Sequence, residues 1–267
     1  MTLLPIENVA EFKRKFALSF QETREQNLLL NSFIYEISLL SNLFIVGGYL
    51  RCLANSEPVR DLDIIVNVSQ VALDELIEKC FLNFRKNRMG GYKVVLDRIA
   101  VDVWSVEDNW AFKTGLVKNA ELNYVDKIAE GTFFNYDSLV IDLHSFQSNF
   151  KHYNVCARTN VLDIIQRNSN YKRLNPTREA NVLRAFYLVK KYKLSLSAQV
   201  VSYIIQNINY SNDLFGSYME KLGETLMKYE KYHAILPKES VEEIVAQFYP
   251  ILVKRNVGDS RDSINLF

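Results

Sequence analysis

Two aspartates separated by a single residue are the side chains of this sequence best suited to chemistry. Asp61 and Asp63 lie in an apolar run that continues to Val66. Because side chains alternate between the two faces of a strand, both carboxylates point to the same face. Two carboxylates this close repel each other unless a cation lies between them. The spacing therefore predicts a divalent-metal site on one face of a strand.

A glycine pair before these aspartates supplies a second component of the same site. Gly47 and Gly48 end an apolar run over residues 44–46. Glycine lets the backbone approach a ligand closely and frees its N–H groups to face a phosphate. A phosphate-binding turn beside a divalent metal is the combination that nucleotidyl transfer requires.

A third aspartate lies in a predicted β-hairpin. Residues 92–96 and 99–104 read as two strands around a turn at Asp97 and Arg98. Asp102 lies in the second strand, where an isolated carboxylate among apolar residues is unfavourable without a partner. We expect it to complete a metal site with Asp61 and Asp63; the alternative is a salt-bridge residue or an edge-strand residue.

The composition is that of an ordinary soluble protein. The chain has 267 residues, of which 48% are apolar and 24% are charged, enough for one large domain or two small ones. It has no run of about 18 apolar residues and no N-terminal secretory signal, so we expect no membrane span. Three cysteines without metal-ligand spacing indicate reduced thiols and a cytoplasmic location.

The fold class that the hydrophobic pattern predicts is α+β. Residues 6–43 read as helical, and 43–46, 60–68, 92–96, 99–104, 132–136 and 139–143 read as strands. Short or amphipathic helices are predicted at 49–54, from 69, at 155–165, after a cap at Asn175, from 197, at 216–232 and at 240–255. Strand signals fade near residue 150. We therefore expect a mixed, mostly antiparallel sheet domain over 1–150 and a helical domain over 151–267.

Positive charge is concentrated at the start of this second region. The net charge of the chain is only +1, yet residues 151–193 contain ten lysines and arginines against two acidic residues, Asp163 and Glu179. Such a segment is a candidate surface for phosphates or nucleic acid. A solvated helical face is the alternative.

With these residues identified, the chain resembles the polymerase-β nucleotidyltransferase superfamily. The likeness is closest to the head domain of CCA-adding enzymes and bacterial poly(A) polymerases, which carry Gly-Gly-x-Val-Arg-Asp and then Arg/Lys-Asp-x-Asp. Residues 47–52 read Gly-Gly-Tyr-Leu-Arg-Cys and residues 60–63 read Arg-Asp-Leu-Asp, with Cys52 in place of the family's aspartate. Weaker likenesses follow at 134–139 and 175–185, and Asp102 lies where the family has its third carboxylate.

The resemblance implies a two-metal reaction. Asp61, Asp63 and Asp102 would be the catalytic residues and would hold Mg²⁺ or Mn²⁺. The nucleotide would be bound by the following residues: Gly47, Gly48, Arg51, Arg60, Arg178 and Arg184. For Arg178, an ordinary surface position at the start of a helix is the alternative.

The function that the resemblance implies is transfer of NMP from an NTP, ATP or CTP, onto an acceptor. An RNA 3′ end, tRNA-like, is the favoured acceptor because of the basic 151–193 segment. One alternative is the same chemistry on a small molecule, nucleotide or protein acceptor, as in second-messenger synthases or toxin and defence transferases. The other is a catalytically silent binding module that acts with a protein partner, which the Cys52 replacement favours.

Overall fold

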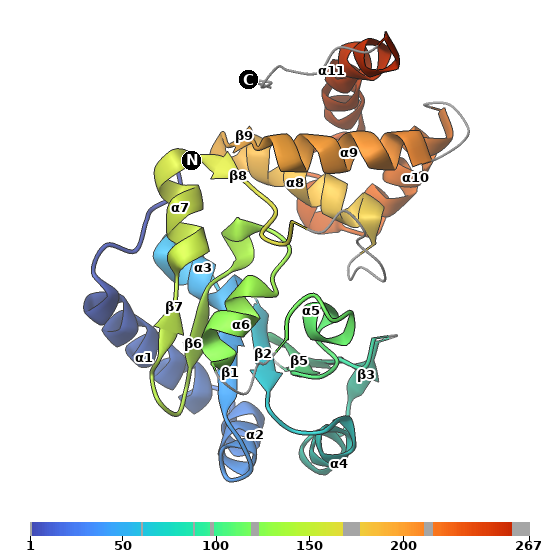
Figure 1. Ribbon diagram of the computed structural model, residues 1–267. Helices are drawn as coiled ribbons and strands as arrows, with labels where there is room; N and C mark the ends of the chain where they lie inside the picture. Colours follow the sequence, from blue (N-terminus) through green and yellow to red (C-terminus); the bar gives the residue numbers. More distant parts are fainter. Residues whose placement is uncertain are drawn as a thin grey trace. The chain divides into compact units, whose positions relative to one another are not determined.

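The computed structural model describes residues 2–59, 61–87, 89–96, 99–118, 123–167, 177–210 and 216–257. The chain divides into two compact units. We call Leu4–Arg158 the N-terminal unit, and Thr159–Phe267 together with the first three residues the C-terminal unit. Figure 1 shows the elements of each unit along the chain. The α+β prediction is confirmed, because a mixed sheet dominates the first unit and helices dominate the second.

The N-terminal unit is built on a seven-stranded sheet with the order β3-β4-β5-β2-β1-β6-β7. Neighbouring strands are antiparallel except for β2 and β5, which run parallel. Its strands are β1 (Leu43–Val46), β2 (Asp61–Val66), β3 (Phe84–Lys86), β4 (Tyr92–Val95), β5 (Ala100–Ser105), β6 (Val140–Asp142) and β7 (Ser148–Asn149). Its helices are α1 (Val9–Glu25), α2 (Leu28–Ser38), α3 (Gly48–Ala54), α4 (Gln70–Cys80), α5 (Trp110–Lys113), α6 (Tyr124–Glu130), the 3₁₀ helix η2 (Asn135–Asp137) and α7 (Lys151–Thr159).

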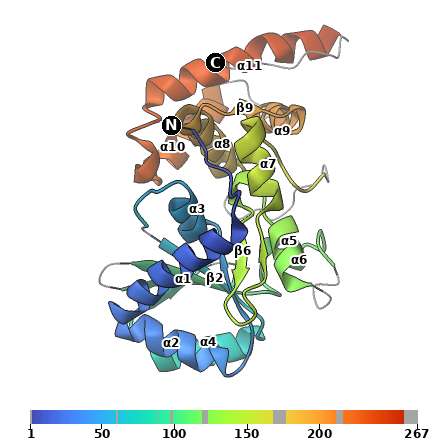
Figure 2. The same cartoon turned by 90° about the vertical axis from the view of Figure 1, so that its left-hand side faces the viewer.

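One face of this sheet is buried and mainly apolar on its central strands. On β2 it carries Leu62 and Ile64, and on β5 it carries Val101 and Val103; all four side chains have no exposed surface. Figure 2 shows α1, α2 and α4 together on one side of the strands and α6 on the other side. Burial of these branched side chains is the main favourable contribution to the stability of the unit.

The opposite face is covered only in part. Around α6, the side chains of Phe44, Ile65 and Val140 form a second buried cluster with Val125 and Ile128 of the helix. Asp61 and Asp63, on the same face of β2 as Ile65, are only half-buried. The face therefore changes along one strand from a packed core to a polar surface.

Local hydrogen bonds explain where several helices begin. The side chain of Asn8 accepts from the Glu11 N–H at the start of α1, and Ser69 accepts from Ala72 at the start of α4. The Ser69 cap confirms the sequence prediction, since Ser and Asn are preferred at this position. The continuous helical region predicted over 6–43 is instead two helices, which separate at Gln26 and Asn27 before β1 begins.

Other predictions for this unit are corrected by the structure. Residues 132–136 were expected to be a strand, but η2 forms there, with Asn135 and Tyr136 buried. The apolar residues of α4 predict an inner face that includes Val71, but Val71 is 68% exposed. The hairpin of β4 and β5 is confirmed by antiparallel pairing, while its turn at Asp97 and Arg98 lies outside the described residues.

The C-terminal unit is mainly helical. Its elements are β8 (Val161–Leu162), α8 (Arg178–Tyr192), β9 (Ser195–Leu196), α9 (Ala198–Tyr210), α10 (Gly216–Met227), the 3₁₀ helix η3 (Glu230–Tyr232) and α11 (Lys238–Val257). Helix α8 contacts α9, α10 and α11, so its buried residues form the centre of the unit. Among the helices that the model describes, none is both long and apolar enough to cross a membrane.

The starts of two helices in this unit were predicted with different success. Thr177 caps α8 by accepting a hydrogen bond from Ala180. The predicted cap Asn175 lies outside the described residues, as does Pro176. The Ser197 cap is confirmed, because its hydroxyl accepts from the Val200 N–H at 3.2 Å.

Candidate functional site

The turn between β1 and α3 brings the glycine pair onto the aspartate-bearing strand. Val46, the last residue of β1, is paired with Asp63 of β2. Gly47 then adopts φ +56°, a backbone conformation that residues with side chains rarely occupy. This turn lets the Gly48 N–H donate to Asp63 Oδ2 over 3.1 Å. The glycine pair is therefore needed for the direction of the chain as well as for space.

Both carboxylates of β2 converge on Gly48. A Cβ atom added at Gly48 would lie 2.9 Å from Asp61 Oδ1 and 3.0 Å from Asp63 Oδ2. Real Cβ atoms do not approach oxygens this closely, so only glycine fits between the two aspartates without displacing them. The close approach places two acceptor groups against one stretch of backbone.

Asp102 reaches the same face by the parallel pairing of β2 with β5. It is the register partner of Asp63, and paired residues of neighbouring strands share a face. The Lys93 Nζ, on the next strand β4, lies 3.8 Å from Asp102 Oδ2. Because the Lys93 side chain is 52% exposed, this pair is weak and leaves Asp102 able to change partner.

The charges of this face act on one another. The pKa of Asp63 is raised to about 6, mainly by burial and next by repulsion from the Asp61 carboxylate. The Arg51 cation opposes the shift, Asp102 adds to it, and the hydrogen bond from Gly48 again opposes it. A cation placed among these carboxylates would remove their mutual repulsion and so lower the pKa of Asp63.

Arg51 has partners that the sequence did not reveal. Its Nη1 lies 2.7 Å from Asp137 Oδ1, and its guanidinium lies over the Tyr136 ring at 4.9 Å from the centroid. The two charged side chains are only 16% and 20% exposed. Asp137 and Tyr136 belong to η2, in the segment that was expected to be a strand, so no local pattern indicated this contact.

The other predicted nucleotide-binding residues are distributed over the chain. The Gly47 N–H donates to the Leu139 carbonyl over 3.0 Å, so both glycine N–H groups have partners within the protein. Arg60 lies outside the described residues. Arg178 and Arg184 are half-buried residues of α8, in the C-terminal unit. Their roles stay predictions.

The donor set of the acidic face suits a hard divalent cation. Mg²⁺ and Mn²⁺ prefer carboxylate oxygens, and Asp61 and Asp63 present two such groups at Gly48. Within the described residues, however, no three His, Cys, Asp or Glu side chains are already grouped as a metal site. Asp61 and Asp63 already lie together, whereas Asp102 would have to leave its ion pair with Lys93 in order to bind the metal ion.

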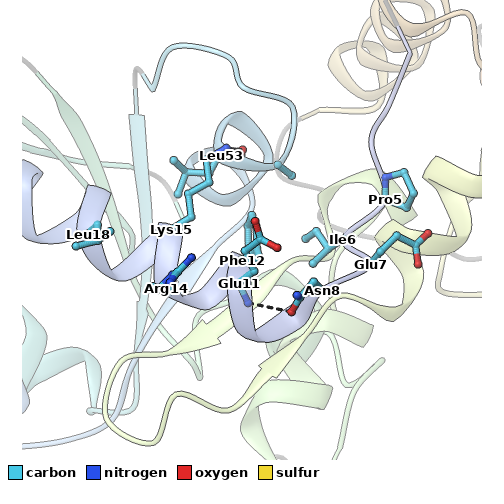
Figure 3. A pocket seen from close by; sticks show the side chains of 11 residues that line it. Pro5, Ile6, Glu7, Asn8, Glu11, Phe12, Arg14, Lys15, Leu18 and Leu53 are labelled. Atoms are coloured by element: carbon cyan, nitrogen blue, oxygen red, sulfur yellow. Dashed lines mark hydrogen bonds between the residues drawn. The ribbon is translucent and has the colours of Figure 1, made fainter.

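Two cavities of the N-terminal unit are lined by other residues. One, of about 380 Å³, lies between residues 5–8, α1 and α3, and Figure 3 shows Lys15 of α1 extending toward Leu53 at the end of α3. The Lys15 Nζ donates to the Leu53 carbonyl over 2.7 Å. The other, of about 640 Å³, lies between α1, α2 and the turn after β6. Neither lining contains Asp61, Asp63 or Asp102.

The fold is similar to that of CCA-adding enzymes of known structure. No family model matches the chain, and no curated protein matches it in sequence. A structure of the Thermotoga maritima CCA-adding enzyme with tRNA aligns at a TM-score of 0.55 and 15% identity over 86% of this chain. A CCA-adding enzyme with CTP aligns at 0.57 and 16% over 98%, and one with ATP at 0.53 and 15% over 97%.

These alignments define the fold and its extent. The chain spans between 51% and 64% of the length of the three similar proteins. At this identity the likeness concerns the architecture, which agrees with the resemblance in the glycine and aspartate motifs. The chain has the same fold as the part of the CCA-adding enzymes to which it aligns.

Proposed function

We propose that this protein is a divalent-metal-dependent nucleotidyltransferase that moves NMP from an NTP onto the 3′ end of an RNA. The observation that carries the proposal is the convergence of Asp61 and Asp63 on Gly48, with Asp102 in register beside Asp63. Three carboxylates on one sheet face are costly without a counter-charge; the pKa of Asp63 is raised by burial first and by repulsion from Asp61 and Asp102 in addition. The similarity in fold to CCA-adding enzymes supports the same reaction class.

The reaction forms one bond and breaks one. The acceptor hydroxyl oxygen bonds to the α-phosphorus of the NTP, the bond from that phosphorus to the bridging oxygen breaks, and pyrophosphate leaves. The hydroxyl proton passes to solvent. Bound Mg²⁺ or Mn²⁺ would supply charge stabilisation for the attacking and leaving oxygens. Asp61 and Asp63 would hold the ion, with Asp102 completing its ligands.

The neighbouring groups of the chain have supporting roles. Because Gly48 has no side chain, the carboxylates of Asp61 and Asp63 can both lie against its backbone, and its N–H orients Asp63 Oδ2. Lys93 would neutralise Asp102 before the ion binds.

An RNA acceptor is favoured by the charge of the 151–193 segment. Its ten basic residues include two that form ion pairs, Arg158 with Glu7 and Arg167 with Asp163. Both pairs are exposed and therefore weak, so these cations can exchange a carboxylate for a phosphate. One similar structure contains tRNA, and others contain CTP or ATP. We infer that ATP or CTP is the donor here.

The proposal is tested by the Asp61→Ala/Asp63→Ala double variant. Purified protein is incubated with each α-³²P-labelled NTP, Mg²⁺ or Mn²⁺, and total RNA. We expect the wild type to label RNA and the double variant to lose at least about 1,000-fold of that rate, because electrostatic stabilisation is the main catalytic contribution. A matched control is Glu36→Gln, which removes one carboxylate from the exposed ion pair with Lys79.

The same assay separates the rival functions. Label in a small product would indicate a small-molecule or nucleotide acceptor in place of RNA, and label in protein a protein acceptor. No label with any NTP, together with tight RNA or protein binding, would favour the silent binding module. Transfer retained by the double variant would remove the mechanism.

A further inference from the structure

Resting on the proposed function, we propose that Asp137 is a positioning residue that holds the Arg51 guanidinium away from the metal-binding carboxylates. Arg51 Nη1 binds Asp137 Oδ1 at 2.7 Å, although its charge is also felt by Asp63. A cation on a mobile side chain beside three carboxylates would compete with a metal ion for them. Asp137 supplies the counter-charge that prevents this.

The distances around Gly47 show that Arg51 also lies close to Asp63, its alternative partner. A Cβ atom at Gly47 would lie 3.0 Å from Arg51 Nη1 and 3.4 Å from Asp63 Oδ2. The guanidinium and the Asp63 carboxylate therefore both lie within 3.4 Å of one point beside Gly47. A small rotation of the Arg51 side chain would pair it with Asp63 in place of Asp137.

Asp137 is held firmly enough to act as such a restraint. Its own N–H donates to the Phe134 carbonyl over 3.0 Å, and Tyr136 beside it is 5% exposed. The Gly47 N–H donates to the Leu139 carbonyl, which joins the same segment to the glycine turn. The Tyr136 ring under the guanidinium adds a cation–π contact that keeps Arg51 on this side.

A simple count of charges gives the expected behaviour of variants. Arg51 and Asp137 together are neutral, so the wild-type site presents its carboxylates to the ion without interference. Asp137→Asn leaves one uncompensated cation beside Asp63. Arg51→Met/Asp137→Asn is again neutral. Because removing both partners also relieves a buried unpaired charge, urea unfolding of each variant is measured beside binding, and a positioning role requires a loss of Mn²⁺ affinity in Asp137→Asn that unfolding does not account for.

The experiment is a double-mutant cycle on Mn²⁺ binding to the full chain, measured by electron paramagnetic resonance of free Mn²⁺. We expect Asp137→Asn to weaken binding about tenfold, and the double variant to return to within about twofold of the wild type. Asp137→Glu, which keeps the charge, should retain most of the affinity. Glu7→Gln, which breaks the exposed pair with Arg158, is the matched control and should change nothing. A double variant as weak as Asp137→Asn would overturn the inference.

A second readout needs neither metal nor turnover. Crystal structures of the metal-free wild type and of Asp137→Asn give the position of the Arg51 guanidinium. In the wild type we expect it over the Tyr136 ring and paired with Asp137, and in the variant paired with Asp63. A guanidinium that keeps its wild-type position in the variant would refute the positioning role even if the wild type bound no Mn²⁺, whereas absent Mn²⁺ binding with a displaced guanidinium would count against the proposed function alone.

Discussion

The two faces of the β2–β5 pair differ in a way that separates folding from chemistry. On one face Leu62, Ile64 and Val101 have no exposed surface, and on the other Asp61, Asp63 and Asp102 are half-buried. The same backbone hydrogen bonds between β2 and β5 support both faces. Because successive side chains alternate, one strand can contribute to the core at every second position and to the site at the positions between.

The clustered carboxylates of the acidic face lower the stability of the fold, and burial of the apolar face offsets this loss. Like charges at neighbouring register positions are unfavourable, and repulsion from Asp61 and Asp102 adds to burial in raising the pKa of Asp63. The buried branched side chains behind them keep the strands in register regardless. Substitutions on the two faces should therefore have opposite signatures, in stability on one and in activity on the other.

The largest expected effect comes from placing a carboxylate on the apolar face. Val101→Asp would bury an unpaired charge where the exposed surface is zero, so we expect the free energy of unfolding to fall by about 4 kcal/mol or more. Val95→Asp, at a position 72% exposed on β4, should change it by less than about 1 kcal/mol. Urea unfolding measures both; equal losses would contradict the contrast between the faces.

A smaller effect, confined to activity, is expected at the glycine that the two aspartates enclose. Gly48→Ala forces Asp61 and Asp63 apart, and we expect nucleotide transfer to fall about 100-fold because small misplacements of reacting groups are this costly. Gly223→Ala, where an added Cβ meets nothing within 4 Å, should instead raise the stability of α10 by about 0.5 to 1 kcal/mol and leave transfer unchanged. Transfer rates with thermal unfolding distinguish the two; full activity in Gly48→Ala would be inconsistent with the site.

The smallest expected effect is a pH-dependent gain in the stability of the Asp63→Asn variant over the wild type. The pKa of Asp63 rises from 3.8 to about 6 on folding, so the folded state binds this proton more tightly than the unfolded state. Stability contributed by the protonated form is therefore complete below pH 3.8 and is lost as the pH rises to about 6. Asp63→Asn carries no charge, so above this range we expect the metal-free variant to be more stable than the wild type by about 1.5 kcal/mol.

Urea unfolding of both proteins on either side of the titration range checks this prediction. At a pH below 3.8 the two should differ little, since Asp63 is protonated in both states. Mn²⁺ should stabilise the wild type above the range and leave Asp63→Asn nearly unaffected. A variant that is less stable than the wild type at every pH would show that the charge of Asp63 supports the fold.

Much of the site was predictable because its signals are local. Period-2 alternation placed Asp61 and Asp63 on one face, and a turn signal between apolar runs placed Asp102 in a hairpin. The register that brings Asp102 beside Asp63 depends on a parallel pairing across a long connection, which no local pattern specifies. For that step the family resemblance supplied what the pattern could not.

Asp137 was missed for a definable reason. Phe134 and Tyr136 are buried and alternate with polar residues, as in a strand, but the hydrogen bond from the Asp137 N–H to Phe134 winds the segment into a 3₁₀ helix. Its partner Arg51 is far away in sequence. Helices α5 and α6 were not predicted from the sequence for a similar reason. Both are short, and their burial depends on the sheet that they cover.

The position of β1 between β2 and β6 has a consequence for synthesis of the protein. Ile45 pairs with Ile64 on one side and with Ile141 on the other, so the second side stays open until the ribosome has extended the chain past β6. Until then the nascent chain exposes a row of unsatisfied amides and carbonyls next to apolar side chains, which invites intermolecular pairing and aggregation. Fragments that stop short of β6 should for this reason be insoluble even though they contain all three aspartates.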